Sequence, residues 1–315
     1  MLRLDNSRAA LRKLLLVQAC AAGAIAWVAH QFGQAHWAPA VALGLGAVLL
    51  VRAAITANNF AMSARFASAT PERFRLSWWG RLRLFGGEFI ATILHSSWFM
   101  ARAVPRLRIY HGGPVPPVLL LHGYGCNSGY WAHLTPLLDA ARISHASIDM
   151  EPLLAGIDEF VPQVAAAIDQ LCERSGARQV ILVGHSMGGL VARAYLRTHG
   201  AARVAHIFTL GTPHHGTALA DAAPGINARQ MRRWDGAAAL DNAWLAELAA
   251  SESPTRRALI TSIYTHHDNI VSPQTSSQLP GANNIELGGV GHVALGSNPA
   301  VLARLLQEIA MMFTR

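Results

Sequence analysis

The sequence has little cysteine, little lysine and few charged residues of either sign. Its three cysteines, Cys20, Cys126 and Cys172, lie far apart, so they indicate no disulfide framework, which is compatible with a reducing cytoplasm. Lys13 is the single lysine against 25 arginines, which points to a GC-rich and therefore bacterial genome. Charged residues make up 14% of the chain and hydrophobic residues 52%, so we expect part of the chain to lie in a membrane.

Two further classes of site are missing. No spacing of His, Cys, Asp or Glu in the sequence is typical of a metal site. His214 and His215 are directly adjacent, which is not a metal-ligand spacing. We expect neither a metal nor a cofactor. The net charge of +8 would suit a nucleic-acid partner, but no nucleic-acid motif accompanies it and the basic residues flank apolar segments. We therefore expect membrane attachment and no nucleic acid. Nothing in the sequence indicates the oligomeric state.

Two apolar segments stand near the start of the chain, at about residues 14–32 and 37–55, within a predicted hairpin region of residues 1–60. Each has 19 residues, close to the ~20 that a helix needs to cross a bilayer. A cleaved signal peptide is the alternative for the first segment, but the second follows it too closely for that. The pattern predicts a transmembrane helical hairpin.

Basic residues orient this hairpin. Residues 1–110 contain 13 Lys and Arg against 3 Asp and Glu, whereas the connecting stretch 33–36 has neither Lys nor Arg. By the positive-inside rule, both ends of the hairpin and the following domain are cytoplasmic, with the hairpin in a bacterial inner membrane. Residues 61–111 are predicted to be an Arg-rich interfacial linker. Its apolar part, residues 85–104, contains Glu88 and His95 and is expected to lie on the membrane surface; if it spans instead, the domain is periplasmic.

After this linker, GGPVPP at 112–117 marks a boundary, and residues 112–315 alternate strands with helices. The expected strands are VLLLH (118–122), SHASID (144–149), QVILVG (179–184), HIFTLG (206–211) and LITSIYT (259–265). Helical patterns such as 160–175 and 187–200 separate them. Alternation of this kind predicts an α/β fold with a mostly parallel sheet and helices on both faces.

The sequence GHSMGG follows one of these strands directly and opens a helix. It fits the Gly-X-Ser-X-Gly pattern of a nucleophile elbow, in which a sharp turn exposes a serine at a helix N-terminus. Ser186 is therefore the candidate nucleophile. A glycine-rich turn with an incidental serine is the alternative, and the strand before it and helix after it make that alternative weaker.

A serine nucleophile needs a base and an acid that orients the base. Asp268 follows the strand LITSIYT, and His292 lies in a glycine-rich loop after a last short strand, so the expected order Ser, Asp, His is met. His266 and His267 precede the acid and are expected to be turn residues or neighbours of the site. Cys126 is a conceivable reactive thiol, but it lacks an elbow.

An oxyanion hole is also required. The loop after the strand VLLLH and the residue after the nucleophile supply its backbone N–H groups in such folds, which nominates Tyr124 and Met187. The segment at about 221–257 is expected to cap the site, and its stretches around Trp234, Trp244 and Leu248 form either a mobile lid or a fixed insertion.

From about Pro117 onward the chain resembles the bacterial triacylglycerol lipases and esterases of the α/β-hydrolase superfamily. The stretches that match are LLLHGYGCN, IDMEPLLAGIDEF, ILVGHSMGGLVAR, LGTPHHGTALA, SIYTHHDNIVSP and GVGHVAL. The resemblance implies the same triad and oxyanion donors, in a serine hydrolase that cleaves acyl esters. Members of this family are often secreted, whereas the predicted hairpin anchors this chain in a membrane, so we expect its esters to be lipids. An acyltransferase or thioesterase on the same fold, or a catalytically inactive membrane scaffold, remains open.

Overall fold

A seven-stranded sheet organises the part of the chain that follows the two apolar helices. The computed structural model describes residues 6–233 and 242–313. Along the sheet the strand order is β1-β3-β2-β4-β5-β6-β7. The strands are β1 (Leu107–Arg108), β2 (Val118–Leu121), β3 (His145–Ser147), β4 (Val180–His185), β5 (Val204–Leu210), β6 (Ile260–Thr265) and β7 (Asn283–Leu287). Only β1 pairs antiparallel, with β3; the other neighbouring pairs are parallel.

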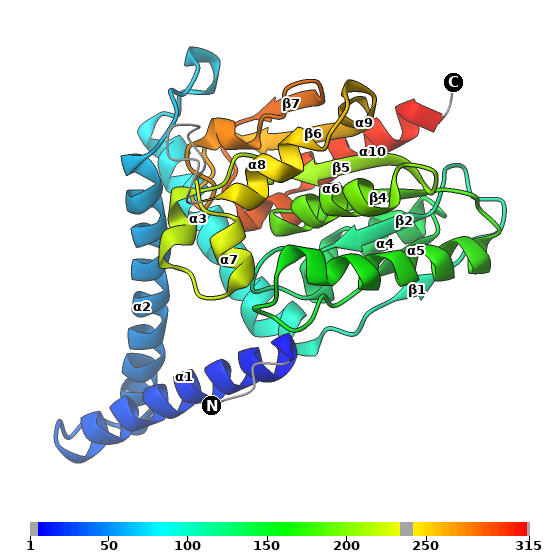
Figure 1. Cartoon of the computed structure of the whole chain (residues 1–315). Helices are drawn as coiled ribbons and strands as arrows, with labels where there is room; N and C mark the ends of the chain where they lie inside the picture. The colour runs from blue at the N-terminus through cyan, green and yellow to red at the C-terminus, as the bar shows by residue number, and fades with distance from the viewer. Residues whose placement is uncertain (1–5, 234–241, 314–315) are drawn as a thin grey trace.

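The helices cover both faces of this sheet and extend beyond it (Figure 1). They are α1 (Ser7–Gln31), α2 (Trp37–Arg65), α3 (Trp78–Leu94), α4 (Thr135–Ala140), α5 (Val161–Ser175), α6 (Met187–His199), α7 (Ile226–Gln230), α8 (Ala243–Ala250), α9 (Pro254–Ala258) and α10 (Pro299–Phe313). Short helical turns are η1 (Glu72–Phe74), η2 (His95–Phe99), η3 (Met100–Arg102), η4 (Ser128–His133), η5 (Ile157–Phe160), η6 (Ala218–Ala222), η7 (Gln274–Ser277) and η8 (Val293–Gly296).

Alternate residues of the strands face two separate cores. In β2, Leu119 and Leu121 pack with α5, α6 and α8, whereas Val118 and Leu120 pack with η4, α4 and α10. This follows from the two-residue period of a strand, whose side chains point to opposite faces. Because both faces are buried at the centre of the sheet, β2 is apolar throughout and β4 begins with four apolar residues. The observed architecture confirms the α/β fold that the strand and helix alternation predicts.

Helix α5 shows how local sequence sets an element. Val164, Ile168 and Leu171 recur at helical spacing and are buried against the sheet. Pro162 sits in the first turn, where its missing N–H costs no hydrogen bond, and Gly176 ends the helix with φ +74°.

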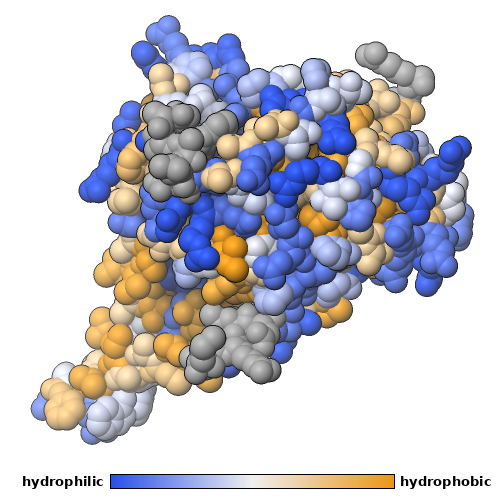
Figure 2. All heavy atoms as spheres, in the orientation of Figure 1, coloured by the Kyte–Doolittle hydropathy of each residue, from blue (hydrophilic) through white to orange (hydrophobic). Residues whose placement is uncertain are grey.

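Helices α1 and α2 form a hairpin that projects from the catalytic domain (Figure 1). Both are long and apolar enough to cross a membrane, and only 11% and 17% of the residues in their most apolar windows are buried, so they are not core helices. Figure 2 shows apolar residues gathered along this projection, while polar residues cover most of the domain on the same face. The second helix continues ten residues past the predicted end of its apolar segment at 55 and reaches the domain.

The segment after the hairpin belongs to the domain's packing. Helix α3 contacts the catalytic loop at η8, and Ala91 on α3 is buried in the same core as α10. Strand β1 lies at residues 107–108, so the sheet starts before residue 112, where the sequence places the domain boundary. The residues predicted as an interfacial linker therefore include elements of the folded domain.

Candidate active site

Ser186 lies in the sharp turn between β4 and α6. Its φ is +54° and its ψ is −122°, a strained conformation for a residue with a side chain. A Cβ on Gly184 would come within 2.5 Å of the Gly189 nitrogen, and one on Gly188 would come within 2.3 Å of the Leu121 oxygen. Glycine at both positions is thus what allows the turn to pack so closely, and the turn is built as a nucleophile elbow.

Asp268 and His292 meet beside this turn, although 24 residues separate them in the chain. His292 Nδ1 lies 2.8 Å from Asp268 Oδ2, and both side chains are buried. The other carboxylate oxygen, Oδ1, accepts hydrogen bonds from the backbone N–H groups of Ile270 and Val271. With one oxygen held by the backbone, the carboxylate can fix the orientation of the imidazole.

The candidate base, His292, lies close to the turn that carries the candidate nucleophile, Ser186. His185, which precedes Ser186, has its ring centroid 4.6 Å from that of His292, and its Nε2 lies 3.2 Å from the His292 carbonyl oxygen. Among the described residues no hydrogen bond joins Ser186 Oγ to His292, and such bonds are often long until substrate is bound. Burial alone would lower the pKa of His292, but the charge and hydrogen bond of Asp268, together with the charge of Glu88, raise it overall.

The candidate oxyanion donors come from two loops. Met187 is the first residue of α6, so its backbone N–H has no partner within the helix. Tyr124 lies in the loop after β2, which His122 holds in place: His122 Nδ1 donates to the Gly123 carbonyl and Nε2 accepts from the Met150 N–H. The phenol of Tyr124 donates a hydrogen bond to the Pro224 carbonyl, so this side chain joins the loop to the segment predicted as the cap. Tyr124 also lines a cavity beside Ser186.

Glu88 is a site residue that the sequence pattern did not single out. Its carboxylate, 1% exposed, accepts hydrogen bonds from the N–H groups of Val293 and Ala294, both at 2.9 Å. These two residues follow His292 directly, and a Cβ on Gly291 would lie 2.5 Å from Glu88 Oε2. Helix α3 therefore clamps the loop that carries the base. The one signal in the sequence was an acidic residue inside an apolar helix.

The end of α2 also reaches the site, which the sequence pattern did not predict either. Ser63 donates from its hydroxyl to the Asp268 carbonyl and accepts at its own carbonyl from Ser272 Oγ. The amide of Gln274 donates to Ser63 Oγ and to the Asp268 carbonyl. The loop of the triad acid is thus tied to the same helix that forms half of the projecting hairpin.

A cavity of about 230 Å³ opens beside Ser186. Most of its lining is apolar and comes from the segment after β5 and from the loop of the triad acid. The lining includes Asn59 of α2, Tyr124, Pro213, Leu219, Ala220, Met231, Ile270 and Val271. A small apolar cavity next to a nucleophile suits an acyl group.

The cap segment is partly described. Leu245 and Leu248 of α8 are buried in the core that α5 and α6 share, and Trp244 Nε1 donates to Asp158 Oδ2 at 2.7 Å. The stretch around Leu248 is therefore a fixed part of the fold. Trp234, the other aromatic residue of the predicted cap, lies outside the described residues.

The other candidates of the sequence have ordinary structural contacts. His266 Nε2 pairs with Glu286 at 3.0 Å, and His267 Nδ1 accepts from the Gly289 N–H. Burial raises the pKa of the Cys126 thiol to about 12, so it is protonated and a poor nucleophile. Within residues 6–233 and 242–313, no three His, Cys, Asp or Glu side chains gather as a metal site would require.

Comparison with known proteins agrees with this geometry. Residues 116–253 match the family model described as the alpha/beta hydrolase fold. This part of the chain has the α/β-hydrolase fold. The mature form of a Bacillus licheniformis lipase has the same fold: its crystal structure gives a TM-score of 0.55 at 19% identity, covering 63% of this chain and 94% of that lipase.

Two triacylglycerol lipases are similar in sequence. The lipase of Pseudarthrobacter phenanthrenivorans is 33% identical over 119 residues, which is 33% of this chain and 35% of that protein. The lipase of Burkholderia plantarii has the same identity over 119 residues, covering 33% of this chain and 31% of its own length. The alignments thus span about a third of each of these relatives.

Proposed function

We propose that this protein is a membrane-anchored serine hydrolase that cleaves carboxylic acyl esters, with lipids as its substrates. The observation that carries the proposal is the buried Asp268–His292 pair beside the strained turn of Ser186. In the proposed reaction Ser186 Oγ attacks the ester carbonyl while His292 Nε2 takes its proton. The tetrahedral oxyanion is stabilised by the N–H groups of Tyr124 and Met187, the second at the N-terminus of α6.

The acyl-enzyme is then hydrolysed. His292 gives the proton to the leaving alcohol, and the C–O bond to that alcohol breaks to leave the acyl group on Ser186. A water molecule, deprotonated by the same imidazole, attacks the acyl carbonyl and restores the serine. Asp268 holds the histidine tautomer and stabilises the imidazolium in both halves of the reaction.

Lipid substrates are favoured by the position of the cavity. The cavity is largely apolar, and Asn59 lines it from α2, the helix whose earlier residues are proposed to lie in the membrane. Its volume of about 230 Å³ is below the ~300–1,000 Å³ typical of ligand pockets, so a long acyl chain would extend out of it. We expect that chain to leave along the apolar surface of α2 and remain in contact with lipid.

A fluorophosphonate probe tests the chemistry. Ser186→Ala is expected to abolish covalent labelling, whereas Ser175→Ala, which removes a serine hydroxyl at the end of α5, leaves labelling unchanged. His292→Ala or Asp268→Asn should lower ester turnover by on the order of 10³-fold or more. Strong labelling that persists in Ser186→Ala would show that the nucleophile lies elsewhere, and a wild-type chain that never labels would favour an inactive scaffold.

The substrate class has a separate test. Turnover of long-chain acyl esters should rise when they form micelles or enter bilayers, because the anchored site meets substrate at an interface. Turnover restricted to short soluble esters or to CoA thioesters would contradict the lipid assignment and favour the thioesterase alternative. A product in which an added alcohol has taken the acyl group would identify an acyltransferase.

A further inference from the structure

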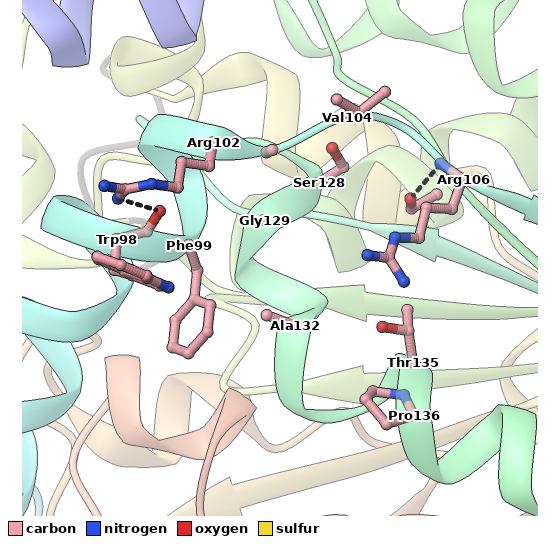
Figure 3. Close-up of a pocket in the computed structure, with 12 residues that line it drawn as sticks. Trp98, Phe99, Arg102, Val104, Arg106, Ser128, Gly129, Ala132, Thr135 and Pro136 are labelled. Atoms are coloured by element: carbon pink, nitrogen blue, oxygen red, sulfur yellow. Dashed lines mark hydrogen bonds between the residues drawn. The ribbon is translucent and has the colours of Figure 1, made fainter.

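A second cavity, of about 310 Å³, lies away from the catalytic residues. It opens between the segment that follows α3 and the turn η4, which comes directly after the oxyanion loop (Figure 3). Residues that face it include Trp98, Arg102, Val104, Arg106, Ser128 and Thr135. No triad residue or candidate oxyanion donor lines it, so the ester-cleaving chemistry leaves this cavity unexplained.

Two exposed arginines stand on opposite sides of the cavity. The guanidinium of Arg102 lies 3.7 Å from the ring centroid of Trp98, and Figure 3 shows Arg106 on the other side, pointing toward Thr135. Among the described residues, no acidic side chain lies within ion-pair distance of either arginine. Asp149 lies on the neighbouring segment, but its carboxylate accepts a hydrogen bond from the backbone N–H of Ser128 and pairs with neither arginine. Arg102 Nη1 donates weakly to the carbonyls of Ser97 and Trp98, at 3.5 and 3.4 Å, so its other donors remain available. Together with Arg106 it gives the cavity two positive charges without a counter-charge from the described residues.

The wall of the cavity also contains a buried hydroxyl without a partner. Ser128 is 6% exposed and lines the cavity, and its Oγ makes no hydrogen bond to any described residue. Buried polar atoms are nearly always hydrogen-bonded, so an unpartnered one on a cavity wall points to a missing acceptor or donor. Beside two guanidinium groups, the group that satisfies it best is an anionic oxygen.

The cavity lies where the proposed membrane helices meet the domain. Arg8 and Arg12, which precede the apolar run of α1, donate to the carbonyls of Ala103 and Ala101 at the cavity's edge. On α2, Arg52 donates to the hydroxyls of two serines in η2, the turn that contains Trp98. Both helices therefore leave the domain at the level of this cavity.

Apolar side chains stand at its rim. Trp98 is 56% exposed and Val104 is 64% exposed. Tryptophan is enriched at the boundary between lipid and water, where its ring meets both. The rim can thus contact acyl chains while the interior of the cavity meets a polar headgroup.

From these observations we infer that the cavity binds the phosphate group of an anionic lipid in the membrane that holds the hairpin. Arginine pairs with phosphate oxygens through two parallel N–H donors, and the hydroxyls of Ser128 and Thr135 can donate to the remaining oxygens. Trp98 and Val104 face the lipid's chains. The inference rests on the proposed membrane attachment, but it is independent of ester hydrolysis, because the site shares no residue with the triad.

Lipid binding to the full chain in detergent micelles tests it, with phosphatidylglycerol and phosphatidylcholine as probes and native mass spectrometry as the readout. The wild-type chain should retain phosphatidylglycerol at a concentration at least about tenfold lower than phosphatidylcholine. Arg102→Gln combined with Arg106→Gln should remove this preference, and Ser128→Ala should weaken it. The matched control, Arg174→Gln with Arg178→Gln, removes an exposed arginine from the last turn of α5 and another from the loop that follows it, and should keep the preference.

Several results would overturn the inference. Equal retention of the two lipids by the wild-type chain would do so, as would a double variant that keeps the preference for phosphatidylglycerol. A control variant that loses as much of this preference as the double variant would also do so. Displacement of phosphatidylglycerol by millimolar inorganic phosphate would indicate a site for the free ion instead. Fluorophosphonate labelling of the same samples keeps the two proposals apart. Samples that label normally but show no lipid preference refute this site alone, whereas failure to label bears only on the hydrolase assignment.

Discussion

At the scale of single residues, the contact that most affects the proposed chemistry is the one between Glu88 and the loop of His292. The carboxylate holds two successive N–H groups directly after the base and contributes to the raised pKa of His292. Removing the charge should therefore change both the position of the base and its protonation. Glu88 would act as a positioning residue, since it touches neither substrate nor nucleophile.

We predict that Glu88→Gln lowers kcat for ester hydrolysis by on the order of 10- to 100-fold, because small displacements of a catalytic group are costly. The pH profile should move as well. A protonated His292 cannot act as a base, so a raised pKa places the acidic limb of kcat/KM above the ordinary histidine value of 6.5. Loss of the Glu88 charge destabilises the imidazolium, and the limb should shift toward lower pH.

The control for this prediction is Glu72→Gln, which removes an exposed carboxylate from the same linker region. It should change neither kcat nor the acidic limb of the pH profile. A Glu88→Gln variant with reduced kcat and an unmoved acidic limb would show that the carboxylate only supports the loop. An unchanged kcat would exclude the positioning role altogether.

A second residue-scale prediction concerns Asn59, which lines the cavity beside Ser186. Asn59→Phe should fill part of the cavity of about 230 Å³ and reduce kcat/KM for long-chain esters by on the order of tenfold relative to short-chain esters, since each methylene left unburied costs about 0.8 kcal/mol. The neighbouring exposed residue provides the control: Asn58→Phe lies on the same helix and lines none of this cavity. Equal losses on all chain lengths in Asn59→Phe would mean that acyl groups bind elsewhere.

At the scale of secondary-structure elements, the packing within the hairpin depends on a close approach between α1 and α2. A Cβ on Gly44 would lie 2.2 Å from the Ala22 carbonyl oxygen, whereas a Cβ on Gly46 would meet nothing within 4 Å. Small residues at such points let two membrane helices approach closely. The two glycines therefore form a matched pair for substitution.

We predict that Gly44→Leu destabilises the hairpin by about 1–3 kcal/mol, while Gly46→Leu is neutral. The readout is the midpoint of thermal unfolding of the full chain in detergent, which should fall by about 2–4 °C for each kcal/mol lost. Equal midpoints for the two variants would show that the helices do not depend on this contact.

The elements also show which features a single sequence can predict. The strand before Ser186, the helix after it and the order of the triad all follow from local patterns, namely apolar runs, glycines and turn residues within a few positions of one another. The roles of Glu88 and Ser63 arise from contacts across more than 200 residues, and local patterns contain no record of those. In the sequence, Glu88 indicated only that residues 85–104 do not cross the membrane. Its hydrogen-bond partners are backbone N–H groups, and these have no sequence signature.

At the scale of the whole molecule, the hairpin and the catalytic domain are joined at both ends of the hairpin. The start of α1 binds the carbonyls of Ala101 and Ala103 through Arg12 and Arg8, and the end of α2 binds the Asp268 loop through Ser63. If the hairpin spans a membrane, as we propose, both of its ends lie on the same side as the sheet domain. The connecting stretch at residues 33–36 is at the far end of the hairpin (Figure 1).

Helix α3 decides how many times the chain crosses. It could reach the opposite side only by withdrawing Glu88 from the N–H groups of Val293 and Ala294 and Ala91 from the core, which would leave a carboxylate to be buried in lipid. We therefore expect two spans. The basic residues then gather on the domain side of the bilayer, which the positive-inside rule identifies as the cytoplasm.

We predict that a fluorescent protein fused after Arg315 is fluorescent in bacterial cells and that alkaline phosphatase fused there is inactive, because that enzyme folds only where disulfides form. The control is alkaline phosphatase fused after Gly33, in the connecting stretch, which should be active. Phosphatase activity at the C-terminus would place the domain in the periplasm, and together with an active Gly33 fusion it would require a third crossing. Since the contacts of Glu88 and of Ala91 exclude such a crossing by α3, that result would also contradict the packing of α3 on the domain, and Glu88→Gln would then leave ester hydrolysis unchanged.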